Sequence, residues 1–403
     1  MNAPPRIAFF TDSFHEVNGV ALTSRQLEAF AARRGYPFLS VHTGPRNKSW
    51  QDGSITRLEI QLSTFTLGLE KDLRFDLFFF RKRNTVRRAL GEFKPDLIHI
   101  TGPSHHGMMG AILAYELKIP LVASWHTNVH EFGGRRLAHN LRFLPGDWSK
   151  KVGLAFESVS LTATARFYRL AHVLLAPNQG LIEMLESRTA RRCFLMQRGV
   201  DTSLYSPLKR TRRDDTFVLG YAGRLSPEKS VRFLAAVEEC LRAAGITNYR
   251  FLVVGHGGEE EWLKANLKQA DFPGVLKGEA LAEAYANMDL FLFPSHTDTY
   301  GNVIQEAMAS GVPCVVTNGG GPRYLVTPGV DGFIATDDQM FCDAVLTLVR
   351  DREQHHKMRL ASRETALQAT WDSVFDRVYQ VYHYCLNSAL VGEPRMLRHP
   401  EGA

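Results

Sequence analysis

Short apolar runs alternate with helix-like segments along most of this 403-residue chain. Four runs in the first half have the length and composition of strands that are buried on both faces: 6–11, 38–43, 95–101 and 120–125. The segment 21–34 and the one that follows Gly102 have the apolar spacing of amphipathic helices. This alternation predicts a doubly wound parallel sheet, in which ligands bind at the carboxyl ends of the strands.

The second half repeats this pattern of strands and helices. Its strand-like runs are 217–222, 250–255, 290–294 and 313–317. Helical spacing covers about 230–244, and a last helix is predicted over about 371–390. Between the halves lies a stretch rich in turn and charged residues, 199–215, where we place the linker. The chain therefore has an α/β architecture with two similar parts.

The overall composition excludes several classes of protein. Apolar residues make up 44% and charged residues 22%, which is typical of a folded soluble chain and not of a disordered or collagen-like one. No apolar run approaches the roughly 20 residues needed to cross a bilayer, and the N-terminus lacks the features of a signal peptide. The five cysteines are scattered without CxxC spacing. We expect a cytoplasmic protein whose cysteines are reduced thiols.

The net charge of +6 is unevenly distributed. Residues 1–204 hold 27 Lys and Arg against 17 Asp and Glu, a net charge of +10, whereas the remainder is at −4. A basic first half suits an anionic lipid surface or nucleic acid, and a merely solvated surface explains it equally well.

The most informative segment runs from Thr297 to Val316. A loop with Asp298 follows a strand, a helix is predicted to begin near Gly301, and Glu306 falls on its second turn. The free N–H groups at a helix N-terminus bind phosphate, and two flanking carboxylates can accept sugar and ribose hydroxyls. Taken singly, Asp298 is better explained as an N-cap and Glu306 as a surface helix residue.

Three further features support a nucleotide-sugar site. Arg224 and Lys229 follow a predicted strand, where two cations can neutralise a diphosphate without a metal. Gly19 follows the first strand, where a glycine allows the backbone to approach a phosphate, although Asn18-Gly19 would also make a plain turn. His126 ends a first-half strand, at the edge where sites form, although such histidines are more often structural.

Several catalytic motifs are absent from the sequence. There is no DxD triplet for Mg²⁺ or Mn²⁺, so we predict no metal ligands. A GxxxxGK[ST] loop, HExxH and GxSxG are also missing, which argues against a P-loop NTPase, a zinc protease and a serine hydrolase.

These residues carry a resemblance to a known family. The motifs are Gly223-Arg-Leu-Ser-Pro-Glu-Lys229, Pro294-Ser, Asp298-x7-Glu306-Ala-Met-Ala-Ser-Gly311-Val-Pro, Gly319-Gly-Gly, Asn18-Gly19-Val, Lys94-Pro-Asp-Leu-Ile-His99 and Ile119-Pro-Leu-Val-Ala-Ser-Trp-His126-Thr. Together they resemble the group 1 (family 4) retaining glycosyltransferases of the GT-B fold, in which two Rossmann-like domains face across a cleft. The chain is most similar to members that make glycolipids, such as sulfoquinovosyl-diacylglycerol synthases and bacterial mannosyl- and glucosyltransferases.

The resemblance implies a division into domains and a role for each. Residues 1–204, with the C-terminal helix of about 375–403, would form the acceptor-binding domain. Residues 205–374 would bind the donor, a nucleoside-diphosphate hexose of the GDP-mannose or UDP-glucose type, with no further cofactor. The site would lie between the domains and close around its substrates.

The resemblance also implies roles for individual residues. Arg224 and Lys229 would bind the diphosphate, and Glu306 the ribose. Asp298, with the backbone of Tyr300, Gly301 and Asn302, would hold the sugar and phosphate. The backbone of Gly19 would approach the phosphate, and His126 would face the transferred sugar. Gly255 and Leu276 would line the base. One departure is Asp298, where the family usually has Glu, and the shorter side chain bears on which sugar is bound.

The implied reaction moves a hexose to an acceptor hydroxyl with retention of configuration and without a metal. Two basic, aromatic segments of the first half, 73–88 and 133–151, have the composition of a lipid-surface contact, so we expect a lipid or glycan acceptor and peripheral association with the inner face of the cell membrane. Alternatively, the aromatic residues are core and the cations a solvated helix face.

Two other functions remain open at this point. One is a soluble transferase that acts on a sugar or small metabolite. The other is a non-catalytic nucleotide- or RNA-binding protein, although the basic segments contain no recognised nucleic-acid module, so no nucleic-acid partner is expected. The oligomeric state is not predicted.

Overall fold

The computed structural model describes residues 3–16, 18–70, 73–126, 148–298 and 300–391. The chain divides into two compact units. The first comprises residues 1–197 and 375–403, and the second comprises residues 198–374. The division thus falls a few residues before the expected domain boundary at 204 and directly before the expected linker at 199–215.

An eight-stranded sheet forms the centre of the first unit, with the order β10-β9-β8-β7-β1-β2-β4-β3. Its strands are β1 (Ile7–Thr11), β2 (Phe38–Thr43), β3 (Lys48–Asp52), β4 (Ile55–Ile60), β7 (Leu97–Ile100), β8 (Leu121–Ser124), β9 (Val173–Ala176) and β10 (Cys193–Leu195). Only the edge strand β3 is antiparallel to its neighbour. A separate antiparallel pair consists of β5 (Thr66–Glu70) and β6 (Leu73–Asp76).

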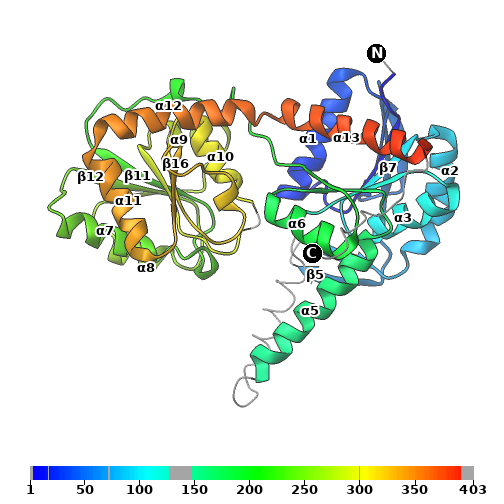
Figure 1. Cartoon of the computed structure of the whole chain (residues 1–403), viewed down its shortest axis with the longest axis horizontal. Helices are drawn as coiled ribbons and strands as arrows, with labels where there is room; N and C mark the ends of the chain where they lie inside the picture. The colour runs from blue at the N-terminus through cyan, green and yellow to red at the C-terminus, as the bar shows by residue number, and fades with distance from the viewer. Residues whose placement is uncertain (1–2, 17, 71–72, 127–147, 299, 392–403) are drawn as a thin grey trace, which may run out of the picture. The chain divides into compact units, whose positions relative to one another are not determined.

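Helices cover both faces of this sheet (Figure 1). They are α1 (Gly19–Arg34), the 3-10 turn η1 (Phe79–Lys82), α2 (Arg83–Phe93), α3 (His105–Leu117), α5 (Trp148–Tyr168), α6 (Gln179–Thr189) and α13 (Trp371–Val391). The chain returns to the first unit through α13, whose Phe375 and Tyr379 rings each lie 5.7 Å from the ring of Phe30 on α1. Aromatic burial thus fixes this helix to the first unit.

A six-stranded, wholly parallel sheet forms the second unit, with the order β13-β12-β11-β14-β15-β16. Its strands are β11 (Phe217–Ala222), β12 (Tyr249–Val254), β13 (Ala270–Gly274), β14 (Leu290–Phe293), β15 (Cys314–Thr317) and β16 (Gly332–Ala335). Its helices are η2 (Pro207–Lys209), η3 (Pro227–Lys229), α7 (Phe233–Ala243), α8 (Glu260–Asn266), α9 (Gly278–Ala286), α10 (Asn302–Ala309), η4 (Pro322–Tyr324), α11 (Asp338–Arg350) and α12 (Arg352–Gln368).

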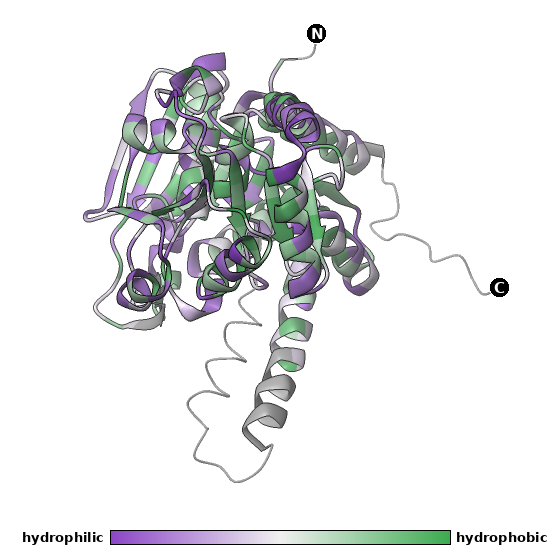
Figure 2. Ribbon diagram, turned by 90° about the vertical axis from the view of Figure 1, so that its left-hand side faces the viewer, coloured by the Kyte–Doolittle hydropathy of each residue, from purple (hydrophilic) through white to green (hydrophobic). Residues whose placement is uncertain are grey.

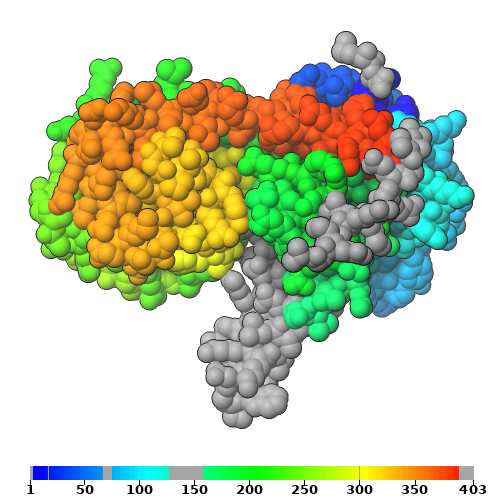
Figure 3. Space-filling model, viewed as in Figure 1, coloured from blue at the N-terminus to red at the C-terminus, as the bar shows by residue number. Residues whose placement is uncertain are grey.

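Two hydrophobic clusters sandwich this second sheet. One packs Tyr285, Met288 and Ile304 against one face, and the other packs Leu234 and Val345 against the opposite face. Hydrophobic residues concentrate on the strands and the inward sides of the helices (Figure 2), whereas α11 and α12 form much of the outer surface that faces the viewer in Figure 3. The predicted doubly wound sheets are therefore confirmed, because continuous apolar strands need helices on both faces.

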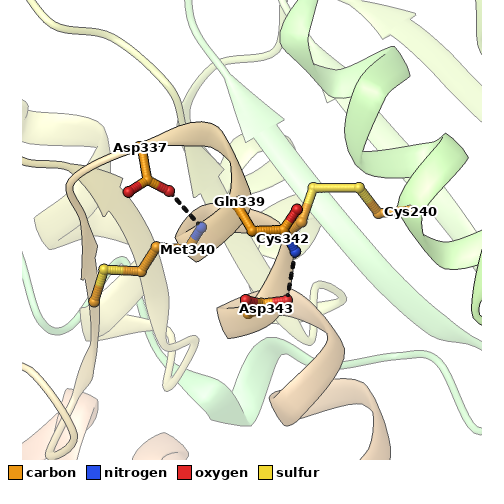
Figure 4. The surroundings of a disulfide bond; sticks show 6 residues. All are labelled: Cys240, Asp337, Gln339, Met340, Cys342 and Asp343. Atoms are coloured by element: carbon orange, nitrogen blue, oxygen red, sulfur yellow. Dashed lines mark hydrogen bonds between the residues drawn. A yellow bond between two sulfur atoms is a disulfide. The ribbon is translucent and has the colours of Figure 1, made fainter.

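The cysteine prediction was wrong for two of the five residues. Cys240 on α7 and Cys342 on α11 form a disulfide, with their Cα atoms 6.2 Å apart (Figure 4). Their separation of 102 positions hides this pairing in the sequence, and the bridge forms because both helices pack on the same face of the sheet. Cys193, Cys314 and Cys385 are free and buried.

The reversal of strand order marks the edge where a ligand site is expected in each unit. In the first sheet the order reverses between β1 and β7, and in the second between β11 and β14. In open α/β sheets the loops after the two adjacent strands diverge at such a reversal, and ligands bind between them. Among the helices in the described ranges, none combines the length and the hydropathy that a bilayer crossing requires.

Candidate active site

Lys229 and Asp298 meet at the carboxyl edge of the second sheet. Lys229 ends the short turn η3 after β11, and Asp298 lies in the loop after β14. The ammonium group of Lys229 forms an ion pair with Oδ1 of Asp298, and both side chains are about four-fifths buried. Residues 69 positions apart are thus joined at the point where the strand order reverses.

The loop that carries Asp298 rests on a glycine triplet. The N–H of Gly321 donates to the carbonyl oxygen of Asp298 at 2.7 Å. A Cβ atom at Gly319 would lie 2.8 Å from Cα of His296, and one at Gly320 would overlap the carbonyl oxygen of Asp298. This close approach explains the Gly319-Gly-Gly motif: a side chain there would displace Asp298.

The helix α10 begins directly after this loop. Its N-cap is Gly301, at φ +102°, and no side chain caps the helix. The alternative role of Asp298 as N-cap is therefore excluded, and the first N–H groups, including that of Asn302, are left without an intrahelical acceptor. Tyr300 is buried, and its hydroxyl donates to the carbonyl oxygen of Arg198 at 2.9 Å.

Glu306 lies on the second turn of α10, as predicted. The hydroxyl of Tyr285 donates to its Oε2 at 2.8 Å, and Tyr205 also hydrogen bonds to this carboxylate. Burial raises the pKa of Glu306, although the two tyrosine hydroxyls partly oppose this shift. Glu306 is therefore a supported, largely desolvated carboxylate, and not the surface residue that was the alternative. Neither tyrosine was identified from the sequence.

Arg224 and the residues expected around the base lie at the same edge. The Arg224 side chain is exposed, and no ion pair connects it to another residue in the described ranges. Gly223 and Gly255 both have positive φ values, of 150° and 140°, and a Cβ atom at Gly255 would overlap the carbonyl oxygen of Gly223. Leu276 is half-buried against the cluster that includes Tyr285.

Gly19 occupies the corresponding position in the first unit. It is the first residue of α1, and Asn18 caps that helix by accepting the N–H of Ala21 at 2.9 Å. Asn18-Gly19 therefore begins a helix and does not form a plain turn, which leaves helix N-terminal N–H groups near the carboxyl edge of β1.

His126 takes part in a chain of side-chain hydrogen bonds. Its Nε2 lies 2.7 Å from the hydroxyl of Ser124, which lies 3.0 Å from Nε2 of His99. Nδ1 of His99 in turn lies 2.7 Å from the hydroxyl of Tyr382 on α13. Burial lowers the pKa of His99 to about 3, so this histidine is neutral at physiological pH.

A polar cluster that the sequence did not reveal lies at the edge between β1 and β7. Nδ1 of His105 is 2.8 Å from Oδ1 of Asp12, and Nε2 of His106 is 3.1 Å from the hydroxyl of Thr43. Asp12, His105 and His106 could together hold a metal ion, as could His15, His42 and Glu59. The adjacent histidines at 105 and 106 were the available sequence signal.

Comparison with known families agrees with this architecture. Residues 17–204 match the family described as Glycosyltransferase Family 4, and residues 216–351 match Glycosyl transferases group 1. The chain is 31% identical over 399 residues to a GDP-mannose-dependent alpha-mannosyltransferase of Mycobacterium tuberculosis, covering 94% of this chain and 96% of the relative. It is 29% identical to a protein of the same description from Corynebacterium glutamicum, covering 94% and 89%.

More distant relatives and solved structures extend the likeness. A sulfoquinovosyl transferase of Arabidopsis thaliana is 27% identical, covering 72% of this chain and 56% of the plant protein. Sucrose-phosphate synthase from Thermosynechococcus elongatus has a TM-score of 0.68 at 17% identity, covering 95% and 100%. HepE of Anabaena in complex with UDP and glucose has a TM-score of 0.63 at 19% identity, covering 94% and 99%.

These structures share the fold of two parallel-sheet α/β domains, and the full-length mannosyltransferase match covers both units. The chain therefore belongs to the group 1, family 4 glycosyltransferases of the GT-B fold, enzymes that transfer a hexose from a nucleotide-sugar donor.

Proposed function

We propose that this enzyme transfers mannose from GDP-mannose to a hydroxyl group of a lipid or glycan acceptor. The relatives described as GDP-mannose-dependent alpha-mannosyltransferases, which match nearly the whole chain, favour this donor. The observation that carries the chemistry is the meeting of Lys229 and Asp298 beside the N-terminus of α10.

In this proposal the enzyme stabilises the departing diphosphate with its own charges. The negative charge that develops on the leaving group lies against Arg224, Lys229 and the positive end of α10. The incoming phosphate competes with Asp298 for the ammonium group of Lys229, because both anions need the same cation. Arg224 offers a planar fork that suits a phosphate oxygen pair. No divalent ion is needed at this position.

The remaining site residues hold the rest of the donor. Glu306, oriented by Tyr285, accepts the ribose hydroxyls, and Asp298 accepts hydroxyls of the transferred sugar. Backbone groups of Tyr300, Gly301 and Asn302 also hold the sugar and phosphate. Gly19 approaches the phosphate, and His126 faces the sugar. The base lies along Gly255 and Leu276. Substrate positioning then brings the acceptor hydroxyl to the donor face that the leaving group occupies. The bond from the sugar to the diphosphate breaks as the bond to the acceptor oxygen forms, and a phosphate oxygen of the leaving group takes the acceptor's proton, so configuration is retained.

The first unit carries a surface suited to a lipid acceptor. Phe65, Leu77 and Phe80 are 62%, 52% and 56% exposed, and the Phe65 ring lies 5.3 Å from that of Phe78. The guanidinium of Arg81 lies 4.4 Å from the centroid of the Phe78 ring. Exposed aromatic groups beside cations favour contact with an anionic membrane. The other basic segment, 133–151, lies largely outside the described residues, and none of its side chains is described.

The proposal is tested with a panel of radiolabelled donors, namely GDP-mannose, GDP-glucose, UDP-glucose and UDP-galactose, and a lipid extract as acceptor. We expect transfer from GDP-mannose, an α-linked product, and full activity in excess EDTA. Transfer from UDP-glucose alone would refute the donor assignment. Loss of activity in EDTA with recovery in Mn²⁺ would refute the metal-free stabilisation of the diphosphate.

A further inference from the structure

A third cation lies beside the phosphate-binding end of α10. Arg198 precedes the second unit's first strand, and its Nη1 donates to Oδ1 of Asn302, the first residue of α10, at 3.2 Å. Its guanidinium lies 5.5 Å from the centroid of the Tyr300 ring, whose hydroxyl holds the Arg198 carbonyl. Backbone and side chain of Arg198 are thus both tied to the segment that begins α10.

The electrostatic setting of Arg198 is unfavourable without an anion. The N-terminus of a helix carries a partial positive charge, so a cation beside it is repelled. Burial lowers the pKa of Arg198, because water solvates its charged form poorly there, yet arginine keeps its proton in proteins. Among the described residues, no carboxylate lies within ion-pair distance of its guanidinium, and the charge of Asp298 acts on it only from farther away.

We propose that Arg198 binds the donor diphosphate as a third cation, together with Arg224 and Lys229. This inference rests on the proposed function of the site. A phosphate at the start of α10 would compensate both the partly buried guanidinium and the helix end, and Asn302 and Tyr300 hold the fork in place before the ligand arrives. Ligand binding thus compensates the electrostatic repulsion between Arg198 and the N-terminus of α10.

Arg198 differs from the other two cations in how it is held. Lys229 is paired with Asp298, and Arg224 is exposed, so both can change position when the ligand binds. The stacked and hydrogen-bonded Arg198 is fixed and offers a planar donor pair. Lysine at this position would keep the charge and lose the fork, so R198K separates the two contributions.

The experiment compares the wild-type enzyme with R198Q, R198K and the control R213Q, which removes an exposed cation from the same unit. Dissociation constants are measured by calorimetry for GDP and for guanosine, which has the base and ribose but no phosphate. We expect R198Q to weaken GDP binding on the order of 10- to 100-fold and to leave guanosine unchanged. R198K should fall between, and R213Q should match the wild type.

The outcomes separate this inference from the proposed function. If the wild-type enzyme binds UDP and not GDP, the donor assignment fails, and the same comparison is made with UDP and uridine. If R198Q binds the diphosphate as tightly as the wild type, or loses nucleoside affinity equally, the inference is overturned. The melting temperature of ligand-free R198Q should equal or exceed that of the wild type, because the repulsion between Arg198 and the N-terminus of α10 is removed. A marked drop in melting temperature would indicate a structural role instead.

Discussion

The hydroxyl oxygen of Ser124 lies 2.7 Å from Nε2 of His126, the histidine that we place at the transferred sugar. Ser124 ends β8, and its hydroxyl is shared with His99, which contacts Tyr382 on α13. A helix from the far end of the chain thus supports the residue that follows β8. The consequence is that the orientation of His126 depends on groups that touch no substrate.

Replacing Ser124 with alanine should lower kcat without weakening donor binding. The imidazole of His126 loses its hydrogen bond to Ser124 and is held less firmly, so we expect a fall of about 10-fold, as for loss of one hydrogen bond of about 1.4 kcal/mol. Steady-state kinetics with GDP-mannose and calorimetry with GDP check the two parts. The matched control is S187A, an exposed serine on α6. Equal losses in kcat and GDP affinity would contradict this role.

Lys229 and Asp298 should respond in opposite directions to neutralisation. K229Q removes a phosphate ligand and should weaken GDP binding about 10-fold or more. D298N frees Lys229 from its ion pair, so GDP binding should be kept or tightened, whereas transfer from GDP-mannose should fall because a sugar contact is lost. Calorimetry and initial rates measure both, with the exposed K264Q as control. Weaker GDP binding in D298N would argue against competition for Lys229.

The charged carboxylate of Glu306 should lower the stability of the folded protein at neutral pH, although it is needed to bind the donor. Its pKa is raised in the folded protein, so the protonated form is the one that folding favours. Its contribution to stability is fully present below the ordinary carboxyl pKa of 4.5 and is lost as the pH rises through the pKa of the folded state. We therefore expect E306Q to keep or raise the melting temperature at pH 7 and to reduce kcat/KM at least 100-fold. The stability gain should vanish below pH 4.5. Unchanged kinetics in E306Q would refute the ribose-binding role.

The Cys240–Cys342 bridge should stabilise the second unit. It closes a loop of 102 residues, and loss of such a crosslink costs about 2–5 kcal/mol. We expect the double variant C240A/C342A to unfold at lower denaturant concentration than the oxidised wild type. Dithiothreitol should lower wild-type stability to that of the variant and leave the variant unaffected. Two free thiols at these positions in the native protein, found by mass spectrometry, would disprove the bridge.

The exposed aromatic surface of the first unit should govern membrane binding. Replacing both Phe65 and Phe80 with serine removes the two exposed aromatic rings that we propose insert into the lipid interface. We expect binding to anionic vesicles to fall at least 10-fold. Sedimentation with neutral and anionic vesicles at low and high salt measures this. L360S, at a leucine 62% exposed on α12, is the control. Salt-independent, equal binding to both vesicle types would contradict the proposal.

Local patterns in the sequence were sufficient to predict much of the fold. The apolar run at 217–222 appears as β11, and the run at 38–43 as β2, because a strand buried on both faces requires uninterrupted hydrophobicity. The meeting of Lys229 with Asp298 was also accessible, since both follow strands and the carboxyl ends of parallel strands share one edge.

Contacts that depend on tertiary packing were not accessible in this way. Tyr205 reaches Glu306 from a segment before β11, and nothing in its local sequence indicates a carboxylate partner. Arg198 was not singled out in the sequence, although its side chain contacts Asn302, which lies 104 positions further along the chain. Strand β3 is exposed and has no apolar alternation. It is a strand because it hydrogen bonds to β4, which its own sequence does not indicate.

The contact between Gly223 and Gly255 has a practical meaning for redesign of this enzyme. Gly255 stands where we expect the nucleotide base, yet a methyl group there would collide with the carbonyl oxygen of Gly223, directly after β11. Libraries aimed at a new donor would therefore gain little from randomising Gly255. If the base lies where we propose, the half-buried Leu276 is the better position to vary, because its side chain packs at the margin of the cluster that includes Tyr285.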